Sequence, residues 1–461
     1  MANVIKHIQV VKRLAQTDIL LSWQTRDATT DALYQWNGTG WTFLAALPGT
    51  GLIYDSTVLQ NRVYWADGKN PINVWKPDID EICEVVDAPV VQYLVTYQGR
   101  IVGGGDARTK AEVEADSGVW PADSNQDRVV YSEPLDDTLW PPNNFIDANV
   151  NNGEVISGLG INSITSATRG AQTQLVVFKP TAILVNDGTL NAAEQRLAVV
   201  SVALGCPGYH SIKNTPHGLI FASKNTVCLM DTSGKEPTQV GFSISPQMKL
   251  IPDAMQKWTA AIFHDNTYKL SFSNADADNN NEEWWLDLKP QIFPQEHNWY
   301  GPMTGDMILQ YAEFSGDLVG AQMLTTNMWK LDVEGVYGSM TASATPRTQV
   351  MTWPRFQAND LKRGFVDAYG FRGIAGAAAA LTFTETLSLD QGNSTTSVSF
   401  ITPADDAIYN VTRPFRKMKY DGQVSISHTS ASDLEIQSLY LRTKLSRRQS
   451  EHLAGGSQTR T

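Results

Sequence analysis

The sequence predicts an all-β protein in which a β-propeller of five to seven blades precedes an antiparallel β-sandwich. The first observation is a recurring module: a short apolar strand, a turn rich in Asn, Asp and Gly, and a second strand that often ends in Trp. It returns about every 30 to 50 residues, a period typical of propeller blades. The second is composition, because only 18% of the residues are charged, whereas Gly (34), Pro (21) and Trp (13) are frequent. The third is a change of texture after Gly338, where Ser and Thr alternate with apolar residues.

The chain divides into four parts. Residues 1–50 hold an N-terminal segment and the first strands, including the hairpin "ALYQWNGTGWTFL". Residues 51–338 hold the propeller, with modules such as "NRVYWADGKNPINVW" and "HGLIFASKNTVCLMD". One such unit cannot bury both of its faces, whereas neighbours stacked in a ring can. Residues 339–446 alternate as the strands of a sandwich do, and residues 447–461 form a polar, Gly- and Ser-rich tail that we expect to be mobile.

The stretch "RVVYSEPLDDTLWPPNNFIDANVNNGEVISGLG", residues 128–160, is predicted to be a blade strand with a long loop. Asp136 and Asp137 are adjacent in a turn, where side chains point apart, so capping of local amides is favoured over an acid–base pair. Trp140, followed by Pro141 and Pro142, suits a rigid loop that buries an indole.

A second acidic turn, "NADADNNNEEWWLDL", places Asp276, Asp278, Asn280 and Glu282 at alternate positions, as the start of a calcium loop does. Asn281 stands where such a loop needs Gly. A solvated hairpin tip is therefore favoured, and calcium binding stays open.

No motif in the chain predicts catalysis, a metal or a cofactor. The glycines at 103–105 lack a phosphate-binding pattern and suit crowded strands near a propeller axis. The three cysteines are far apart, as expected of buried free thiols in a reducing compartment. The seven histidines are scattered, and a catalytic histidine assembled only by folding stays open. The sequence thus predicts no enzyme and no cofactor.

Charge and hydropathy restrict the partners. The formal net charge of −12 repels duplex phosphate, so tight DNA binding is not expected. The sequence offers no apolar segment long enough for a signal peptide or a membrane span, which predicts synthesis and folding in a cytoplasm.

Two basic clusters stand out near the C-terminus. Their candidate interface residues are Arg413, Arg416, Lys417, Arg442, Lys444 and Arg447. Arg442 and Lys444 would share one face of a strand. The clusters could dock onto an acidic partner or a neighbouring subunit, or they could be ordinary solvated strand faces; the sequence favours neither.

The order of motifs in the middle of the chain resembles bacteriophage tail β-propeller proteins, the hub or nozzle proteins of short-tailed phages that include packaged-DNA stabilisation proteins. The resemblance rests on the stretch at 128–160, then on "TQLVVFKPTAILVNDG", "LGCPGYHSIKNTPHGLIFASKNTVCLMD" and "ISPQM". It covers residues 97–248, about a third of the chain. Each motif is a structural signal of a propeller, and their order is the more specific feature.

This resemblance implies a structural virion protein in the phage tail. The chain would form a homo-oligomeric ring, by resemblance a hexamer, below the portal–adaptor complex and in contact with other tail proteins. Duplex DNA would pass through the lumen without sequence-specific binding, and the ring would help to retain and eject the genome. The alternative is a glycan-binding or polysaccharide-degrading tail propeller, for which Trp284, Trp285, Trp299 and Tyr300 could supply a stacking platform.

Overall fold

The computed structural model describes most of residues 4–331 and the strands between residues 348 and 445. Within the first range the undescribed residues are 14–15, 50–51, 110, 114–124, 149–152, 167–169, 187–189, 191–196, 235, 277, 291–292, 295–296, 305–307, 324 and 326. The chain forms two compact units, one of residues 1–299 and 306–331 and one of residues 300–305 and 332–461.

The first unit is built on a seven-bladed β-propeller, which confirms the predicted fold at the upper end of its range of blade numbers. Among the described residues, six blades are four-stranded sheets and the seventh has three strands. Blades 1 to 3 comprise β1 (Ile5–Val11), β2 (Ile19–Thr25), β3 (Asp31–Trp36), β4 (Trp41–Leu47), β5 (Asp55–Leu59), β6 (Arg62–Ala66), β7 (Asn73–Lys76), β8 (Glu81–Glu84), β9 (Tyr93–Tyr97), β10 (Arg100–Gly104), β11 (Arg128–Tyr131) and β12 (Phe145–Asp147).

Blades 4 to 7 continue in chain order around the ring. They comprise β13 (Gly158–Ser166), β14 (Gly170–Phe178), β15 (Ile183–Asn186), β16 (Ala198–Ser201), β17 (Lys213–Thr215), β18 (Gly218–Ser223), β19 (Thr226–Asp231), β20 (Thr238–Gln239), β21 (Ala260–His264), β22 (Thr267–Phe272), β23 (Glu282–Asp287), β24 (Trp299–Thr304), β25 (Ile308–Phe314), β26 (Asp317–Gln322) and β27 (Met328–Lys330). Blade 1 lies within residues 1–50, the part of the sequence assigned to an N-terminal segment and the first strands, ahead of a propeller starting at residue 51.

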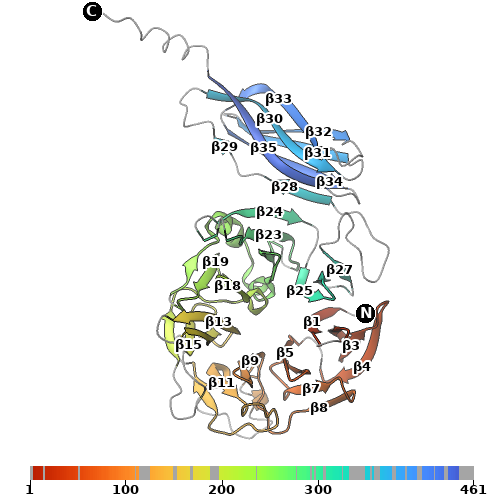
Figure 1. Ribbon diagram of the computed structural model, residues 1–461, viewed down its shortest axis with the longest axis vertical. Helices are drawn as coiled ribbons and strands as arrows, with labels where there is room; N and C mark the ends of the chain where they lie inside the picture. Colours follow the sequence, from red (N-terminus) through yellow and green to blue (C-terminus); the bar gives the residue numbers. More distant parts are fainter. Residues whose placement is uncertain are drawn as a thin grey trace, which may run out of the picture. The chain divides into compact units, whose positions relative to one another are not determined.

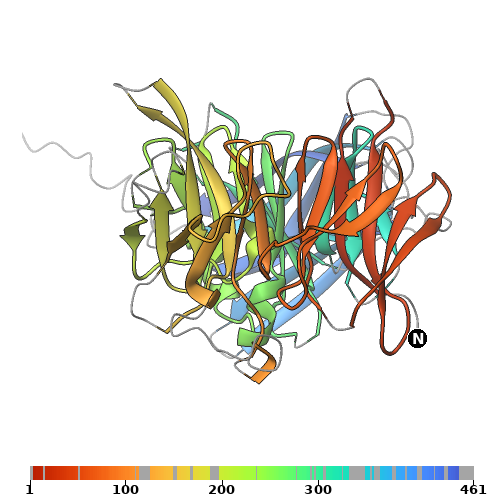
Figure 2. The same ribbon diagram turned by 90° about the horizontal axis from the view of Figure 1, so that it is seen from below.

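The first strand of every blade lines the centre of the ring. Each of β1, β5, β9, β13, β17, β21 and β25 contacts the first strand of the next blade, and β25 returns to β1. Figure 1 looks down on this ring, and Figure 2 shows the blades from the side. The ring brings residues that are distant in sequence to one axis.

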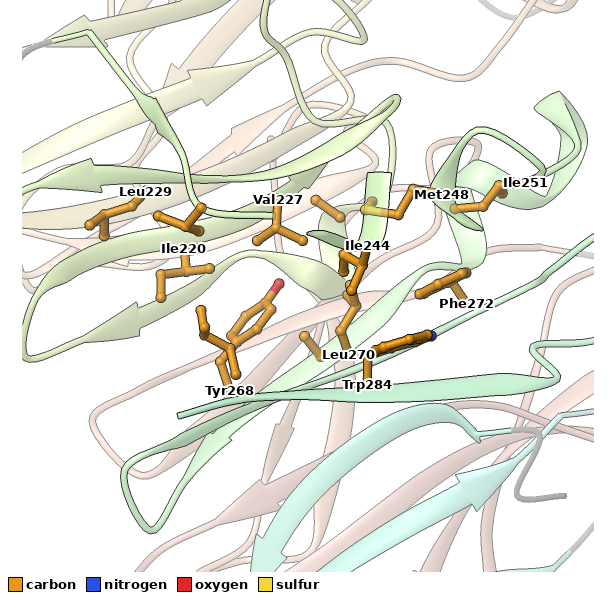
Figure 3. Close-up of a cluster of buried hydrophobic side chains, with 14 of the residues drawn as sticks. Ile220, Val227, Leu229, Ile244, Met248, Ile251, Tyr268, Leu270, Phe272 and Trp284 are labelled. Carbon is orange, nitrogen blue, oxygen red and sulfur yellow. The ribbon is translucent and has the colours of Figure 1, made fainter. Parts of the chain in front are cut away.

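The hydrophobic cores lie between neighbouring blades, as expected of units too small to bury both faces alone. One cluster joins Ile220, Val227 and Leu229 of blade 5 to Leu270 and Trp284 of blade 6 (Figure 3). Four further clusters join blades 1 and 2, 2 and 3, 3 and 4, and 4 and 5. Burial of this apolar area is the main favourable contribution to folding, at about 25 cal/mol per Å².

The seam between blades 7 and 1 is closed by polar contacts as well. The buried Gln310 side chain accepts from the Ile8 N–H and donates to the Ile8 carbonyl, each at 2.9 Å. The Ile5 N–H donates to the Thr325 carbonyl at 2.9 Å. At the surface Lys12 pairs with Glu313, whose carboxylate also binds His264. No blade combines strands from both ends of the described chain, so these contacts take the place of a shared sheet.

The second unit contains two antiparallel sheets. Their strands are β28 (Thr348–Thr352), β29 (Phe356–Gln357), β30 (Gly364–Ala375), β31 (Ala380–Leu389), β32 (Gly392–Ile401), β33 (Ile408–Lys419), β34 (Asp421–Thr429) and β35 (Leu434–Leu445). One sheet has the order β28-β34-β31-β32 with β29 on β34, and the other has the order β33-β30-β35. The strands are where the alternating pattern predicts them, and the packing of both sheets as a sandwich stays a prediction.

Candidate functional site

A loop between blades 4 and 5 runs over the propeller axis. This crossing loop, residues 202–212, includes the short 3-10 helix η2 (Tyr209–Ser211). The Tyr209 hydroxyl donates to the Tyr54 carbonyl, ahead of blade 2, at 2.6 Å. On another side, the Tyr268 hydroxyl of blade 6 donates to the Ser211 carbonyl at 2.8 Å. The loop therefore joins blades that are not neighbours in the ring.

The local sequence "GCPGYHS" explains how the loop keeps this course. An added Cβ on Gly205 would lie 2.2 Å from the Lys179 carbonyl oxygen, and one on Gly208 would lie 2.6 Å from the Gln256 carbonyl oxygen. Only glycine fits such close backbone approaches. The Ser211 hydroxyl donates to the Gly208 carbonyl at 2.6 Å and accepts from the Ala222 N–H at 3.0 Å, which anchors the loop to blade 5.

Six titratable side chains from five segments converge at the crossing loop, and two of them belong to the loop itself. We call this set the axial cluster: His7 of β1, Asp55 of β5, Tyr93 of β9, Tyr209 and His210 of the crossing loop, and Lys213 of β17. The rings form a chain of contacts, with centroid separations of 5.0 Å for Tyr93–Tyr209, 3.9 Å for Tyr209–His210 and 5.6 Å for His210–His7. Tyr209 and both histidines are buried, and the other three side chains are half-buried.

A hydrogen-bond relay sets the tautomer of His7. The Ser56 hydroxyl donates to Oε1 of Gln9 at 2.9 Å, so it accepts from Nε2 of His7, 2.6 Å away. Nδ1 of His7 is then a bare acceptor. It is buried without a hydrogen-bond partner, and so is Nε2 of His210.

Asp55 and Lys213 form the charged part of the axial cluster. The Asp55 carboxylate accepts from the backbone N–H groups of Leu94 and Ser56, both at 2.8 Å. Lys213 interacts electrostatically with Asp55 and His7, and has no hydrogen bond or ion pair among the described residues. Its ammonium group can therefore donate to a ligand.

The surroundings shift every pKa in the axial cluster. Burial raises the pKa of Asp55 to about 7, although the two backbone donors and Lys213 oppose the shift. Burial lowers the pKa of Lys213 to about 8, with Asp55 acting against it. Burial, with the charge of Lys213, lowers the pKa of His7 to about 3 and that of His210 well below its usual value. Both imidazoles are neutral at pH 7. Such clusters of perturbed groups are typical of functional sites.

Asp136 and Asp137, the acidic pair of the 128–160 stretch, have structural roles. Asp136 accepts from the Thr138 N–H and hydroxyl, which confirms turn capping at that position. Asp137 binds the side chains of Arg62 and Tyr64 instead and fastens the loop to blade 2.

The indole predicted to be buried in the same loop is indeed buried. Trp140 is 8% exposed and donates to the Asp137 carbonyl at 3.0 Å. The loop thus folds around its own tryptophan, as the sequence predicts.

Asp276 and the amide nitrogen of Asn280 in the possible calcium loop bind local protein groups, whereas Oδ1 of Asn280 is buried without a partner among the described residues. Asp276 caps the N–H groups of Asp278 and Asn279, while the amide of Asn280 donates to the Trp258 and Ile308 carbonyls. Nowhere in the described part of the chain do three His, Cys, Asp or Glu side chains gather as a metal site would require.

The predicted glycine and cysteine roles agree with the structure. An added Cβ on Gly103 would lie 2.8 Å from Val91, as crowding of strands requires. The cysteines are free; Cys206 and Cys228 are buried and Cys83 is half-buried.

The four aromatic residues of the alternative do not form one platform. Trp284 and Trp299 pack on the core between blades 5 and 6. Trp285 is stacked by Lys269, with the ammonium nitrogen 4.4 Å from the ring centroid, and Tyr300 is 47% exposed.

The candidate interface residues lie on the second unit. Arg413, Arg416 and Lys417 are on β33, and Arg442 and Lys444 are on β35. Both strands flank β30, where Tyr369 pairs with Arg413 and Ala368 with Arg442. Arg447 lies outside the described residues. Their role in docking stays a prediction.

Sequence reasoning missed the axial cluster. Its members are far apart in the chain and belong to no spacing motif, so only ring closure brings them together. The one available signal was position: Asp55, Tyr93 and Lys213 each open the first strand of a blade. The open possibility of a histidine site assembled by folding corresponds to His7 and His210.

Comparisons with known proteins bear on the fold. No family model and no curated protein matches the chain. An exo-β-1,3-galactanase from Phanerochaete chrysosporium, solved with β-1,3-galactotriose, matches 84% of this chain and 95% of its own at 10% identity and a TM-score of 0.28. An arabinoxylan arabinofuranohydrolase of glycoside hydrolase family 43 from Bacillus subtilis matches 76% and 95% at 10% identity and a TM-score of 0.25. BamB from Moraxella catarrhalis matches 72% and 97% at 10% identity and a TM-score of 0.38.

These matches correct one expectation. The sequence predicted no enzyme, yet two of these three matched propellers are glycoside hydrolases, so enzymatic activity is no longer excluded. All three TM-scores are below 0.5, so no activity is transferred from these matches. No helix among the described residues is long and apolar enough to cross a membrane.

Proposed function

We propose that this chain is a glycan-binding propeller, with the axial cluster at the end of its binding site. One observation carries the proposal: buried Nδ1 of His7 and Nε2 of His210 lack partners close to the charged Lys213 and Asp55. Buried polar groups are normally hydrogen-bonded, and in this proposal a polar ligand supplies the missing partner.

Sugar hydroxyls fit the donor and acceptor pattern of the axial cluster. A hydroxyl group can donate to the bare Nδ1 of His7 and accept from the Lys213 ammonium group. Asp55 can accept from another hydroxyl when ionised and donate when protonated. The half-buried ring of Tyr93 offers an apolar surface next to them.

The axial cluster also has part of the chemistry needed to cleave a glycosidic bond. Most glycoside hydrolases use two carboxyl groups, one of which protonates the leaving oxygen. Asp55, with its pKa raised to about 7, suits that proton donor. It is the one carboxyl group in the axial cluster, so the proposal is for binding, and cleavage is measured alongside it.

A glycan array followed by calorimetric titration of the full chain tests the proposal. We expect Lys213→Met and Asp55→Asn to weaken binding at least 10-fold. Lys224→Met is the matched control, because Lys224 is exposed and pairs only with Asp253 at the surface among the described residues. Product analysis of bound oligosaccharides reports cleavage. Absence of binding to any glycan, or wild-type affinity in a folded Lys213→Met variant, would overturn the proposal and leave water as the partner of the histidines.

A second candidate is the tail ring, and the order of motifs in residues 97–248 supports it. In the structure these motifs supply the strands of blades 3 to 5 and the crossing loop, so they are structural elements. As a phage tail hub or nozzle component, the chain would assemble into a ring that contacts adaptor and portal proteins and surrounds passing DNA.

Assembly measurements test the tail ring separately from glycan binding. Charge reversal at Arg413, Arg416 and Lys417 should impair ring formation or adaptor docking. Light scattering and electron microscopy of the purified chain, alone and with adaptor, give the readout. Unchanged assembly of the variant would refute the role of these residues, and a monomer under all conditions would refute the ring.

A further inference from the structure

A groove of about 730 Å³ lies between blades 4 and 5, and none of the residues that line it belongs to the axial cluster. It is lined by Ser163, Ile164, Gln172, Thr173, Asn214, Thr215, Pro216 and Thr232. Six of these eight carry a hydroxyl or amide group, and none is charged. Ser163, Thr173 and Asn214 are exposed, so a ligand can reach their polar atoms.

Two buried amides beside the groove have unmet hydrogen-bonding capacity. Asn162 is 0% exposed and Gln174 is 4% exposed, and Oδ1 of the first and Oε1 of the second lack partners. The Asn162 amide donates to the Asp231 carbonyl at 3.0 Å, and an added Cβ on Gly234 would lie 3.1 Å from Oε1 of Gln174. Both amides thus sit against the turn that also supplies Thr232 to the lining.

The groove and the axial cluster share strand β17. Lys213 belongs to the cluster, while the next two residues, Asn214 and Thr215, line the groove. At about 3.3 Å per residue, Lys213 and Thr215 are about 7 Å apart along the strand, so the axial cluster and the groove lie close together. The Asn214 amide also donates to the Ser163 hydroxyl at 3.3 Å, which links the first strands of blades 4 and 5.

We infer that this groove binds an uncharged stretch of a polysaccharide whose end reaches the axial cluster. The inference rests on the proposed glycan function and adds the substrate class. An acidic polysaccharide would find no cation in the lining, and an apolar ligand would leave the six polar side chains unpaired. Neutral sugar units can pair with hydroxyl and amide groups through direct and water-mediated hydrogen bonds.

Calorimetric titration of the full chain with neutral and acidic oligosaccharides of one to six units tests this. Ser163→Trp fills the groove, and Asn214→Ala removes one of its amides with little risk to folding. Thr42→Trp is the control, because Thr42 is also exposed on a strand but lies on β4 of blade 1. We expect both groove variants to weaken the binding of longer neutral oligosaccharides at least 10-fold and to leave monosaccharide binding unchanged.

The outcomes separate this inference from the proposed function. Wild-type affinity of both groove variants for long oligosaccharides refutes the groove and leaves the axial site intact. Preference for acidic oligosaccharides also refutes it. If the wild-type chain binds no saccharide at all, the proposed function fails and the groove assignment fails with it.

Discussion

Replacing Gln310 with alanine should open the seam between blades 7 and 1. Its side chain makes two hydrogen bonds to the backbone of Ile8, both 2.9 Å long and both buried. Gln310→Ala leaves the Ile8 N–H and carbonyl without partners at a place where water is excluded. Leaving one buried polar group unpaired costs about 1–3 kcal/mol.

The two unpaired groups should lower the free energy of unfolding by about 3 kcal/mol. The hydrogen bond from Ile5 to Thr325 remains and limits the loss at the seam. A propeller of about 330 residues has an unfolding entropy of roughly 0.7 kcal/mol per kelvin, so the melting temperature should fall by about 4 °C. If the seam opens locally, amide exchange at Ile8 should accelerate about 100-fold, since every 1.4 kcal/mol is tenfold.

Differential scanning calorimetry and hydrogen exchange of the full chain measure these effects. Lys12→Ala is the control at the same seam. Its exposed ion pair with Glu313 is worth at most about 1 kcal/mol, so the melting temperature should hardly change. A Gln310→Ala protein that melts and exchanges like the wild type would show that the two hydrogen bonds of Gln310 do not hold the seam closed.

Three further predictions concern the axial cluster and the crossing loop. The pKa of His7 is lowered to about 3 in the native protein, so below about pH 6.5 His7 is protonated in the unfolded chain but not in the native protein. The free energy of unfolding therefore falls as the pH drops. Urea titrations at pH 4 and pH 7 should show that His7→Gln loses less stability on acidification than the wild type. Gly208→Ala should lower the free energy of unfolding by about 1–3 kcal/mol in thermal or urea unfolding, because the new Cβ would lie 2.6 Å from the Gln256 carbonyl oxygen. An unchanged stability would mean that the loop has room to shift. Tyr209→Phe should cost about 1 kcal/mol in the same assay through loss of its bond to Tyr54, and a larger loss would show that the hydroxyl does more than anchor the loop.

Much of the fold could be predicted because its signals are local. Alternating apolar residues and Asn–Gly turns mark the hairpins, and Trp65 and Trp75, which stand at or near strand ends, are buried between blades as the pattern indicates. Asp136 and Trp140 of the 128–160 stretch and the buried Cys206 and Cys228 also behave as the sequence predicts. The number of blades could not be fixed because the modules are degenerate and because the last blade has three strands in the described part of the chain.

The axial cluster could not be predicted because it depends on the closure of the ring. His7 and Lys213 belong to blades 1 and 5, and each looks like an ordinary polar residue of a short strand. Their pKa shifts arise mainly from desolvation inside the closed ring, which no single blade provides. The expectation that the chain is no enzyme rested on the absence of a linear motif, and a site that is assembled only by folding carries no such motif.

The anchors of the crossing loop impose an order on its assembly. Residues 202–212 are synthesised before blade 6, yet the Ser211 carbonyl is bound by Tyr268 of that blade. A nascent chain that ends before β21 holds the whole loop and five blades but lacks this partner. This anchor of the loop can form only after translation has passed Tyr268, so we expect the loop to be completed late and the "GCPGYHS" segment of shortened chains to be more open to proteases.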